Sequence, residues 1–140
     1  QSFFNGLMSE NASSCEGKGL YTYNDFIVAA TVYSGFGTIR SNEVRKRVLV
    51  SFFANVMLET GGMCYINERN PLMNDCMSSS TWLCASSKSY HGRGPLQLSW
   101  NYNYGATRKS IRFDGVNNPE KVGKDRVVLF KMTVWFWMKN

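Results

Sequence analysis

Apolar residues recur at three- and four-residue steps between residues 42 and 60, which predicts an amphipathic helix there. Ser41 stands before this segment as an N-cap, because its hydroxyl can accept a hydrogen bond from an unpaired N–H group of the first turn. Gly61 and Gly62 end the helix, since glycine readily adopts the left-handed conformation of a helix C-terminus. The predicted core face consists of Val48, Leu49, Phe52, Phe53, Val56 and Met57.

Three further helices follow from the same pattern. Residues 5–10 read as the end of a helix, residues 22–33 as a second one, and residues 124–138 as the last. Residues 64–105 are predicted to form loops and short extended segments. The buried face of the second helix is predicted to contain Tyr23, Phe26, Ile27, Ala30 and Val32. The sequence therefore predicts an α+β fold that is mainly α-helical, with one small irregular β region.

The last helix is apolar nearly all round, as expected for a helix in the middle of a domain. Its large side chains alone could bury roughly 600–1,000 Å². We therefore expect an apolar face that residues 1–140 do not fully cover, so that a further segment or a second chain completes it. The residues concerned are Phe130, Trp135, Phe136 and Trp137.

Composition predicts one folded domain. The 140 residues are 44% hydrophobic and 19% charged, and no repeat or linker divides them. No apolar run reaches the 18 or so residues of a membrane span. The net charge of +6 permits an acidic partner, and a basic nucleic-acid binder is one hypothesis that rests on charge alone. We interpret the basic clusters at 45–47 and at Arg108, Lys109 and Arg112 as solvated surface.

Four cysteines and a single histidine disfavour a zinc site, which needs closely spaced ligands, and we expect neither metal nor cofactor. An even cysteine count favours an extracellular disulfide protein, with three pairings possible. The sequon at Asn11 agrees with secretion. The cysteines are Cys15, Cys64, Cys76 and Cys84.

Residues 89–105, SYHGRGPLQLSWNYNYG, combine a glycine-proline turn with amide, hydroxyl and aromatic side chains. Flat aromatic faces beside neutral hydrogen-bonding groups suit an uncharged sugar, whose rings have apolar faces and a polar edge. His91 and Arg93 lie in the turn. We interpret His91 as structural and Arg93 as a support that bonds backbone or carboxylate groups.

Hydrolysis of a glycosidic bond needs two carboxyl groups. Glu59 ends the apolar helix and is expected to project from the core into a cleft, where partial desolvation would favour its protonated form. Glu68 lies nine residues further on, just after Cys64.

These segments resemble glycoside hydrolase family 19, the plant-type chitinases, and most of all the short-loop class IV group. The resemblance covers nearly the whole chain and rests on blocks in the family's order: FFNGLMSENASSCEGKG at 3–19, SGFGT at 34–38, FFANVMLETGGMCYINE at 52–68, residues 89–105, FDGVNNPE at 113–120 and the closing WFWM. It implies a lysozyme-like, bilobed fold with a central cleft. It also implies that residues 1–140 are a single chitinase catalytic domain that lacks the family's C-terminal segment and a hevein-like chitin-binding domain.

The same resemblance implies the disulfides Cys15–Cys64 and Cys76–Cys84, and an endochitinase that acts by inversion. Glu59 matches the family's general acid, Glu68 its general base and Ser99 the serine that holds the attacking water. Thr60 is expected to help orient the base or the water. Trp82, Gln97, Tyr102 and Asn103 match residues that bind the sugar.

The expected substrate is chitin or chitooligosaccharide of the fungal cell wall, in plant defence, with no nucleic-acid or membrane partner. We expect a secreted or vacuolar protein, monomeric unless another chain covers the last helix. Some residues depart from the family: Leu58 replaces a histidine, residues 106–108 replace glycines, and Arg112 replaces a small residue. These departures motivate an alternative, a chitin-binding, chitinase-like defence or storage protein with little or no hydrolysis.

Overall fold

The computed structural model describes residues 1–8 and 13–139, which form a mainly helical fold. Asn11, with its sequon, and Glu10 lie outside the described residues. The elements are α1 (Ser2–Met8), α2 (Tyr23–Ala30), α3 (Asn42–Glu59), α4 (Asn101–Ala106), α5 (Arg108–Ile111), the 3₁₀ helix η1 (Pro119–Gly123) and α6 (Arg126–Lys139). In the described ranges the β region is reduced to two isolated bridges, Asn67 with Arg93 and Arg93 with Leu98.

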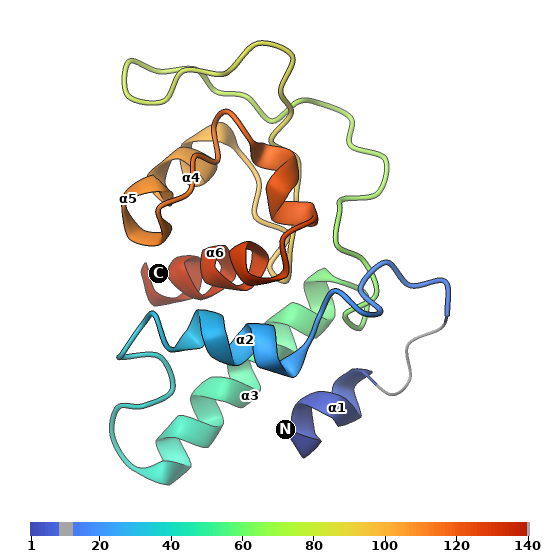
Figure 1. Cartoon of the computed structure of the whole chain (residues 1–140), viewed down its shortest axis with the longest axis vertical. Helices are drawn as coiled ribbons and strands as arrows, with labels where there is room; N and C mark the ends of the chain where they lie inside the picture. Colours follow the sequence, from blue (N-terminus) through green and yellow to red (C-terminus); the bar gives the residue numbers. More distant parts are fainter. Residues whose placement is uncertain (9–12, 140) are drawn as a thin grey trace.

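Helix α6 runs through the middle of the molecule (Figure 1). Helices α1, α2 and α3 lie on one side of it, and α4, α5 and η1 lie on the other, beneath the long loop that follows α3. Its most extensive packing is against α2 and then η1. The arrangement gives α6 neighbours on several sides, which explains why its sequence is apolar nearly all round.

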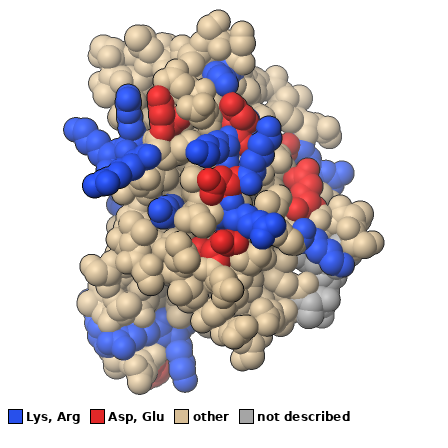
Figure 2. Space-filling model, in the orientation of Figure 1, with Lys and Arg blue, Asp and Glu red and all other residues tan. Residues whose placement is uncertain are grey.

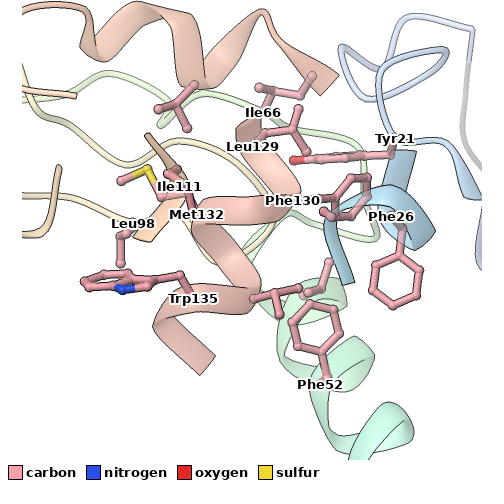
Figure 3. Packing of buried hydrophobic residues seen from close by; sticks show 14 of the residues in the cluster. Tyr21, Phe26, Phe52, Ile66, Leu98, Ile111, Leu129, Phe130, Met132 and Trp135 are labelled. Carbon is pink, nitrogen blue, oxygen red and sulfur yellow. The ribbon is translucent and has the colours of Figure 1, made fainter. Parts of the chain in front are cut away.

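Aromatic rings fill the core on the α2–α3 side of α6. The Phe130 ring lies 5.8 Å from that of Tyr21 and 5.6 Å from that of Phe26, between ring centroids. On the opposite side of α6, Trp135 points toward Leu98 (Figure 3). The pair of Phe26 and Phe130 is edge-to-face, and aromatic pairs in this geometry add about 0.5–1.5 kcal/mol each beyond the burial of apolar area.

The predicted helix over 42–60 is confirmed as α3. The Ser41 hydroxyl accepts a hydrogen bond from Val44 N–H at the N-cap, and Gly61 and Gly62 both have positive φ after the last turn. The predicted second helix is shorter, Tyr23–Ala30, and its buried face is partly wrong. Ile27 and Val32 are exposed, whereas Phe26 and Ala29 are buried, and the Phe26 ring packs against aromatic rings of α1, α3 and α6.

The expectation for the last helix is wrong for two of its aromatic residues. Phe130 is 0% and Trp135 is 8% exposed within this chain. Only Phe136 and Trp137 stay half-buried near the end of α6. The core residues packed around α6 therefore cover most of the apolar face that was expected to stay uncovered.

Both disulfides expected from the resemblance are present, Cys15–Cys64 and Cys76–Cys84. No helix in the described part of the chain is both long enough and apolar enough to span a bilayer. Figure 2 shows Lys and Arg gathered over the start of α3 and around α5, with acidic and basic side chains mixed across the centre and right of the view. Arg108, Lys109 and Arg112 are exposed, as expected for solvated surface.

Candidate active site

The C-terminus of α3 opens onto two hollows that share Glu59. The first, here the polar hollow, measures about 390 Å³. The second, here the apolar hollow, measures about 410 Å³. Glu59, Tyr65, Asn67, Glu68, Arg69, Gly92 and Gln97 line the polar hollow, and Asn55, Glu59, Leu96, Phe136 and Trp137 line the apolar one.

Glu59 is exposed, and Leu58 before it is 79% exposed. The last turn of α3 thus carries Glu59 into the hollow as expected, but the chain does not desolvate it, because α3 ends beyond its packed face. Thr60 differs from the expectation. It is fully buried, its hydroxyl donates to the Val56 carbonyl and it accepts from Met63 N–H, so it closes the helix and does not reach the hollow.

The segment that leads to Glu68 is tied to the start of the chain. Besides the disulfide at Cys64, the Glu16 carboxylate accepts hydrogen bonds from the N–H groups of Ile66 (3.1 Å) and Asn67 (3.2 Å). The Tyr21 hydroxyl donates to the Tyr65 carbonyl at 2.8 Å. These contacts fix the backbone immediately before Glu68.

Glu68 itself is exposed but held at two points by Gly92. Its N–H donates to the Gly92 carbonyl at 2.8 Å, and its Oε2 accepts from Gly92 N–H at 2.8 Å. The bridge between Asn67 and Arg93 places the two segments side by side. One carboxylate oxygen is thus anchored, and the other is left for the hollow.

The turn at 92–97 presents Gln97. Its side-chain N–H₂ donates to the carbonyls of Ile66 and Gly94, both at 3.0 Å, so the amide oxygen remains for an outside donor. Its φ of 46° is a left-handed conformation that costs a non-glycine residue energy. The two amide contacts offset that cost.

Arg93 is buried beneath this turn, 6% exposed. Its Nη1 donates to the carbonyls of Ser89 and His91 and to the Tyr104 hydroxyl at 2.9 Å. The expectation that Arg93 bonds the backbone is confirmed. Burial raises the pKa of Tyr104 to about 12, although the Arg93 charge opposes that rise.

Asp75 belongs to a loop segment that is hydrogen-bonded to the backbone on either side of the turn at 92–97. Its carbonyl accepts from Asn101 N–H at 3.2 Å, and the Asn74 carbonyl accepts from Tyr90 N–H at 2.7 Å. Burial raises the pKa of the Asp75 carboxyl, and the negative charge of Glu68 raises it further.

Four predicted site residues, the catalytic Ser99 and three residues expected to bind the sugar, lie on α4 or against it and do not line the polar hollow. Asn103 donates through Nδ2 to the Ser99 carbonyl at 2.8 Å, and the Tyr102 ring stacks on Trp100 with centroids 6.2 Å apart. Trp82 packs so closely on Gly105 that no side chain fits there. The structure thus brings Glu59, Glu68 and Gln97 to one hollow, and sets Trp82, Ser99, Tyr102 and Asn103 in the adjoining segments.

Sequence reasoning missed Asn55 and Leu96, and it assigned Phe136 and Trp137 only to an uncovered apolar face. One pattern could have found Asn55: it lies four residues before Glu59, so both fall on one face of α3. The part played by Leu96, Phe136 and Trp137 depends on how α6 and the turn meet α3, which no local pattern encodes.

Comparison with known proteins is consistent over the whole chain. The family model described as class I chitinase of glycoside hydrolase family 19 matches residues 1–140. Chitinase 4 of Oryza sativa subsp. japonica is 49% identical over 142 residues, covering 100% of this chain and 50% of that protein. The acidic endochitinase of Dioscorea japonica is 46% identical, covering 100% and 56%. The chain spans about half the length of the curated relatives it matches.

Solved structures agree on the fold. The class IV chitinase of Zea mays, a family 19 protein, superposes with a TM-score of 0.94 at 45% identity, covering 99% of this chain and 69% of that one. Chitinase C of Streptomyces griseus superposes with a TM-score of 0.84 at 35% identity, covering 96% and 63%. The expected mainly helical, lysozyme-like fold is confirmed.

Proposed function

The chain belongs to glycoside hydrolase family 19, and on this premise we propose that it is an endochitinase that hydrolyses β-1,4 bonds between N-acetylglucosamine units. The observation that carries the proposal is the meeting of Glu59 and Glu68, from separate segments, in one hollow. Its volume of about 390 Å³ lies in the range of small-ligand sites, roughly 300–1,000 Å³.

The two carboxyl groups would divide the work of an inverting hydrolysis. Glu59 donates a proton to the leaving glycosidic oxygen, and Glu68 takes a proton from a water that attacks the opposite face of the sugar. Gly92 N–H holds Oε2 of Glu68, which leaves Oε1 to face the water. Ser99, which lies in the segment adjoining the hollow, would hold the same water, as the family resemblance implies. The proton balance needs no metal or other cofactor.

Neutral polar groups and aromatic rings would bind the sugar units. The free amide oxygen of Gln97 can accept from the N–H of an acetamido group. The stacked rings of Trp100 and Tyr102 offer a flat apolar face, and Tyr102 is 38% exposed. Asn103 and Trp82 would extend this surface.

We infer chitin or chitooligosaccharides as the partner and a secreted, or vacuolar, monomeric protein as the form. Two disulfides support that location, because disulfides persist in oxidising compartments.

A second candidate is a protein that binds chitin with little or no hydrolysis. The exposure of Glu59 favours it, because a general acid gains from desolvation and Leu58 provides no cover. Both candidates use the same sugar surface and differ only in turnover.

Hydrolysis of chitin hexasaccharide, followed by NMR of the anomeric protons, tests the proposal. Inversion yields the α-anomer first, and a first product of β configuration would overturn the mechanism. Glu59→Gln should lower kcat by about 10²–10⁴ with little change in binding, because an amide cannot donate the proton. Glu43→Gln, at the other end of α3, is the matched control. Binding without turnover, unchanged by Glu68→Ala, would favour the second candidate.

A further inference from the structure

His91 is the only histidine of the chain and precedes the glycine that holds Glu68. Its ring is half-buried, with Nδ1 2.9 Å from the Ser89 hydroxyl and 3.4 Å from Nη2 of Arg93. Its carbonyl accepts from the Tyr104 hydroxyl at 2.8 Å and from Nη1 of Arg93 at 3.3 Å. Both the ring and the backbone of His91 are therefore tied to Arg93.

Arg93 selects one form of the imidazole. A guanidinium can only donate hydrogen bonds, so the contact to Nδ1 requires that nitrogen to be an acceptor. The single proton of the neutral ring then lies on Nε2. Burial lowers the pKa of His91 below its ordinary value, and the Arg93 charge lowers it further.

The segment from His91 to Arg93 connects this contact to Glu68. Gly92, in the middle of the segment, makes both hydrogen bonds that hold Glu68. The Gly92 N–H donates to Oε2 of Glu68, and the Gly92 carbonyl accepts from the backbone N–H of Glu68. A shift of His91 relative to Arg93 therefore moves the atoms that position the carboxylate.

We propose that His91 is a positioning residue for Glu68: as a neutral imidazole that accepts from Arg93 at Nδ1, it keeps Gly92 against the carboxylate. The inference rests on the proposed role of Glu68 as the base. A protonated ring would carry N–H at Nδ1 and direct it at a guanidinium. That contact would be lost, and the two cations would repel one another.

Charged groups on every side of the ring bear on this balance. Glu68 and Asp75 face His91 and favour its charged form, whereas Arg93 and burial favour the neutral one and prevail. Beyond Arg93, Tyr104 donates to the His91 carbonyl and Glu120 interacts with the guanidinium charge. The neutral ring is therefore the form present near neutral pH, and acid pH protonates it.

NMR on the whole ¹⁵N-labelled chain tests the proposal without substrate. Because His91 is the sole histidine, its ring nitrogens are observed without overlap. We expect an unprotonated Nδ1, a protonated Nε2 and a midpoint below the ordinary value of 6.5. The Gly92 amide proton should shift with the same midpoint, and that shift should vanish in His91→Asn. A proton on Nδ1, or a Gly92 amide that ignores the titration, overturns the proposal.

The pH profile of chitin hexasaccharide hydrolysis supplies the second readout. His91→Asn places an oxygen where Nδ1 lies, so it keeps the acceptor and does not titrate. Its activity at pH 7 should stay within about threefold of the unchanged chain, and its acid limb should move to lower pH. His91→Phe lacks the acceptor and should lose about tenfold at pH 7, the effect of one lost hydrogen bond to a charged group, and the difference should shrink at acid pH, where the unchanged chain has lost the same contact. Identical acid limbs in His91→Asn and the unchanged chain overturn the proposal.

Ser89→Ala is the matched control, because it removes the hydroxyl contact to Nδ1 and leaves the Ser89 carbonyl that Arg93 bonds. A profile like that of the unchanged chain supports Arg93 as the selecting group, and the loss seen with His91→Phe would contradict it. The two readouts separate the hypotheses. A chain without turnover refutes the proposed function, and the NMR titration still decides the role of His91.

Discussion

Arg93 shows how single residues shape this site. A buried charge is costly unless it is hydrogen-bonded, and within the described residues Arg93 bonds carbonyl, hydroxyl and imidazole acceptors and no carboxylate. Its positive charge is therefore not cancelled by direct pairing. The same hydrogen bonds order the turn that carries Gly92 and Gln97, so the cation organises both the backbone that holds Glu68, the proposed base, and the amide proposed to bind the sugar.

Removing one hydroxyl from this network should be costly. Tyr104→Phe takes away the donor to the His91 carbonyl and an acceptor of Arg93, both in a fully buried position. We expect the free energy of unfolding to fall by about 1–3 kcal/mol, measured by urea denaturation. Tyr102→Phe, on an exposed ring, should change it by less than about 0.5 kcal/mol. Equal effects of the two substitutions would contradict the network.

The sequence predicted some residues of the site and not others, for physical reasons. A carboxylate after an apolar helix and before two glycines marked Glu59, and the turn pattern marked Gln97. The sequence did not predict which groups the Thr60 hydroxyl bonds. It could bond the backbone at the end of the helix or point into the cleft, and the outcome depends on how the next turn folds over it. The exposure of Glu59 likewise depends on where α3 leaves the core.

At the scale of elements, long periodic segments were predictable and short ones were not. The α3 bounds were predicted within a residue or so, because its core positions repeat over the whole length. Helices α4, α5 and η1 have 6, 4 and 5 residues, too few to show a period. Helix α4 also follows Trp100, whose φ of 73° is rare for a bulky residue. Tertiary packing, not propensity, places these elements.

Helix α6 depends on a cap. Asp125 Oδ1 accepts from the N–H groups of Val127 (3.1 Å) and Val128 (3.0 Å), which otherwise lack a partner within the helix. Asp125→Ala should lower the free energy of unfolding by about 1 kcal/mol, and Asp125→Asn, which keeps an acceptor, by a few tenths. Thermal and urea unfolding of the three proteins checks this order. If Asp125→Asn lowered the free energy of unfolding as much as Asp125→Ala, the charge of Asp125 would matter more than its hydrogen bonds to the helix N-terminus.

The two disulfides should differ in their effect. Cys15–Cys64 joins residues 49 apart, and Cys76–Cys84 joins residues 8 apart. In the chain-entropy model the longer loop contributes about 4 kcal/mol and the shorter about 2.5 kcal/mol. Replacing each pair by serine and measuring urea unfolding should therefore destabilise the Cys15–Cys64 variant more. That variant should also lose more activity, because Cys64 anchors the segment leading to Glu68. The reverse order would refute the argument.

At the scale of the molecule, α6 lies between two groups of elements (Figure 1), and the residues that line the two hollows come from both of them. Glu59 comes from the α3 side, Glu68 and Gln97 come from the long loop, and Phe136 and Trp137 come from α6 itself. Composition and the family resemblance predicted this fold class. They did not predict the covering of Phe130 and Trp135, because area alone does not say which neighbours reach a helix.

Stability should fall in alkali through the buried tyrosines. The folded chain raises the pKa of Tyr104 from 10.0 to about 12, through burial, and burial also raises the pKa of Tyr21. The unfolded chain then binds fewer protons than the folded one above pH 10, so stability is full below pH 10 and falls as pH rises toward 12. Each such tyrosine contributes a slope of about 1.4 kcal/mol per pH unit. Urea unfolding at several pH values checks it, and Tyr104→Phe should show a shallower slope. If the free energy of unfolding of Tyr104→Phe fell with pH as steeply as that of the unchanged chain, groups other than Tyr104 would cause the alkaline loss of stability.

The net charge of +6 does not imply a charged ligand, and salt dependence decides this point. Lys and Arg gather over the start of α3 and around α5 (Figure 2), whereas Glu59, Glu68 and Arg69 line the polar hollow. A neutral chitooligosaccharide releases no counterions on binding, so its Kd should change by less than about twofold between about 0.05 and 0.5 M NaCl.

Nucleic acid held by the basic clusters would instead weaken by orders of magnitude over the same range. Calorimetry of the Glu59→Gln chain with chitin hexasaccharide, repeated with duplex DNA, separates the two, since this variant binds without turnover. DNA binding that is tighter than sugar binding at low salt, and that disappears at high salt, would favour a nucleic-acid-binding function of the basic clusters. Salt-insensitive sugar binding places recognition in the neutral groups of the hollow, where Gln97 offers its amide oxygen.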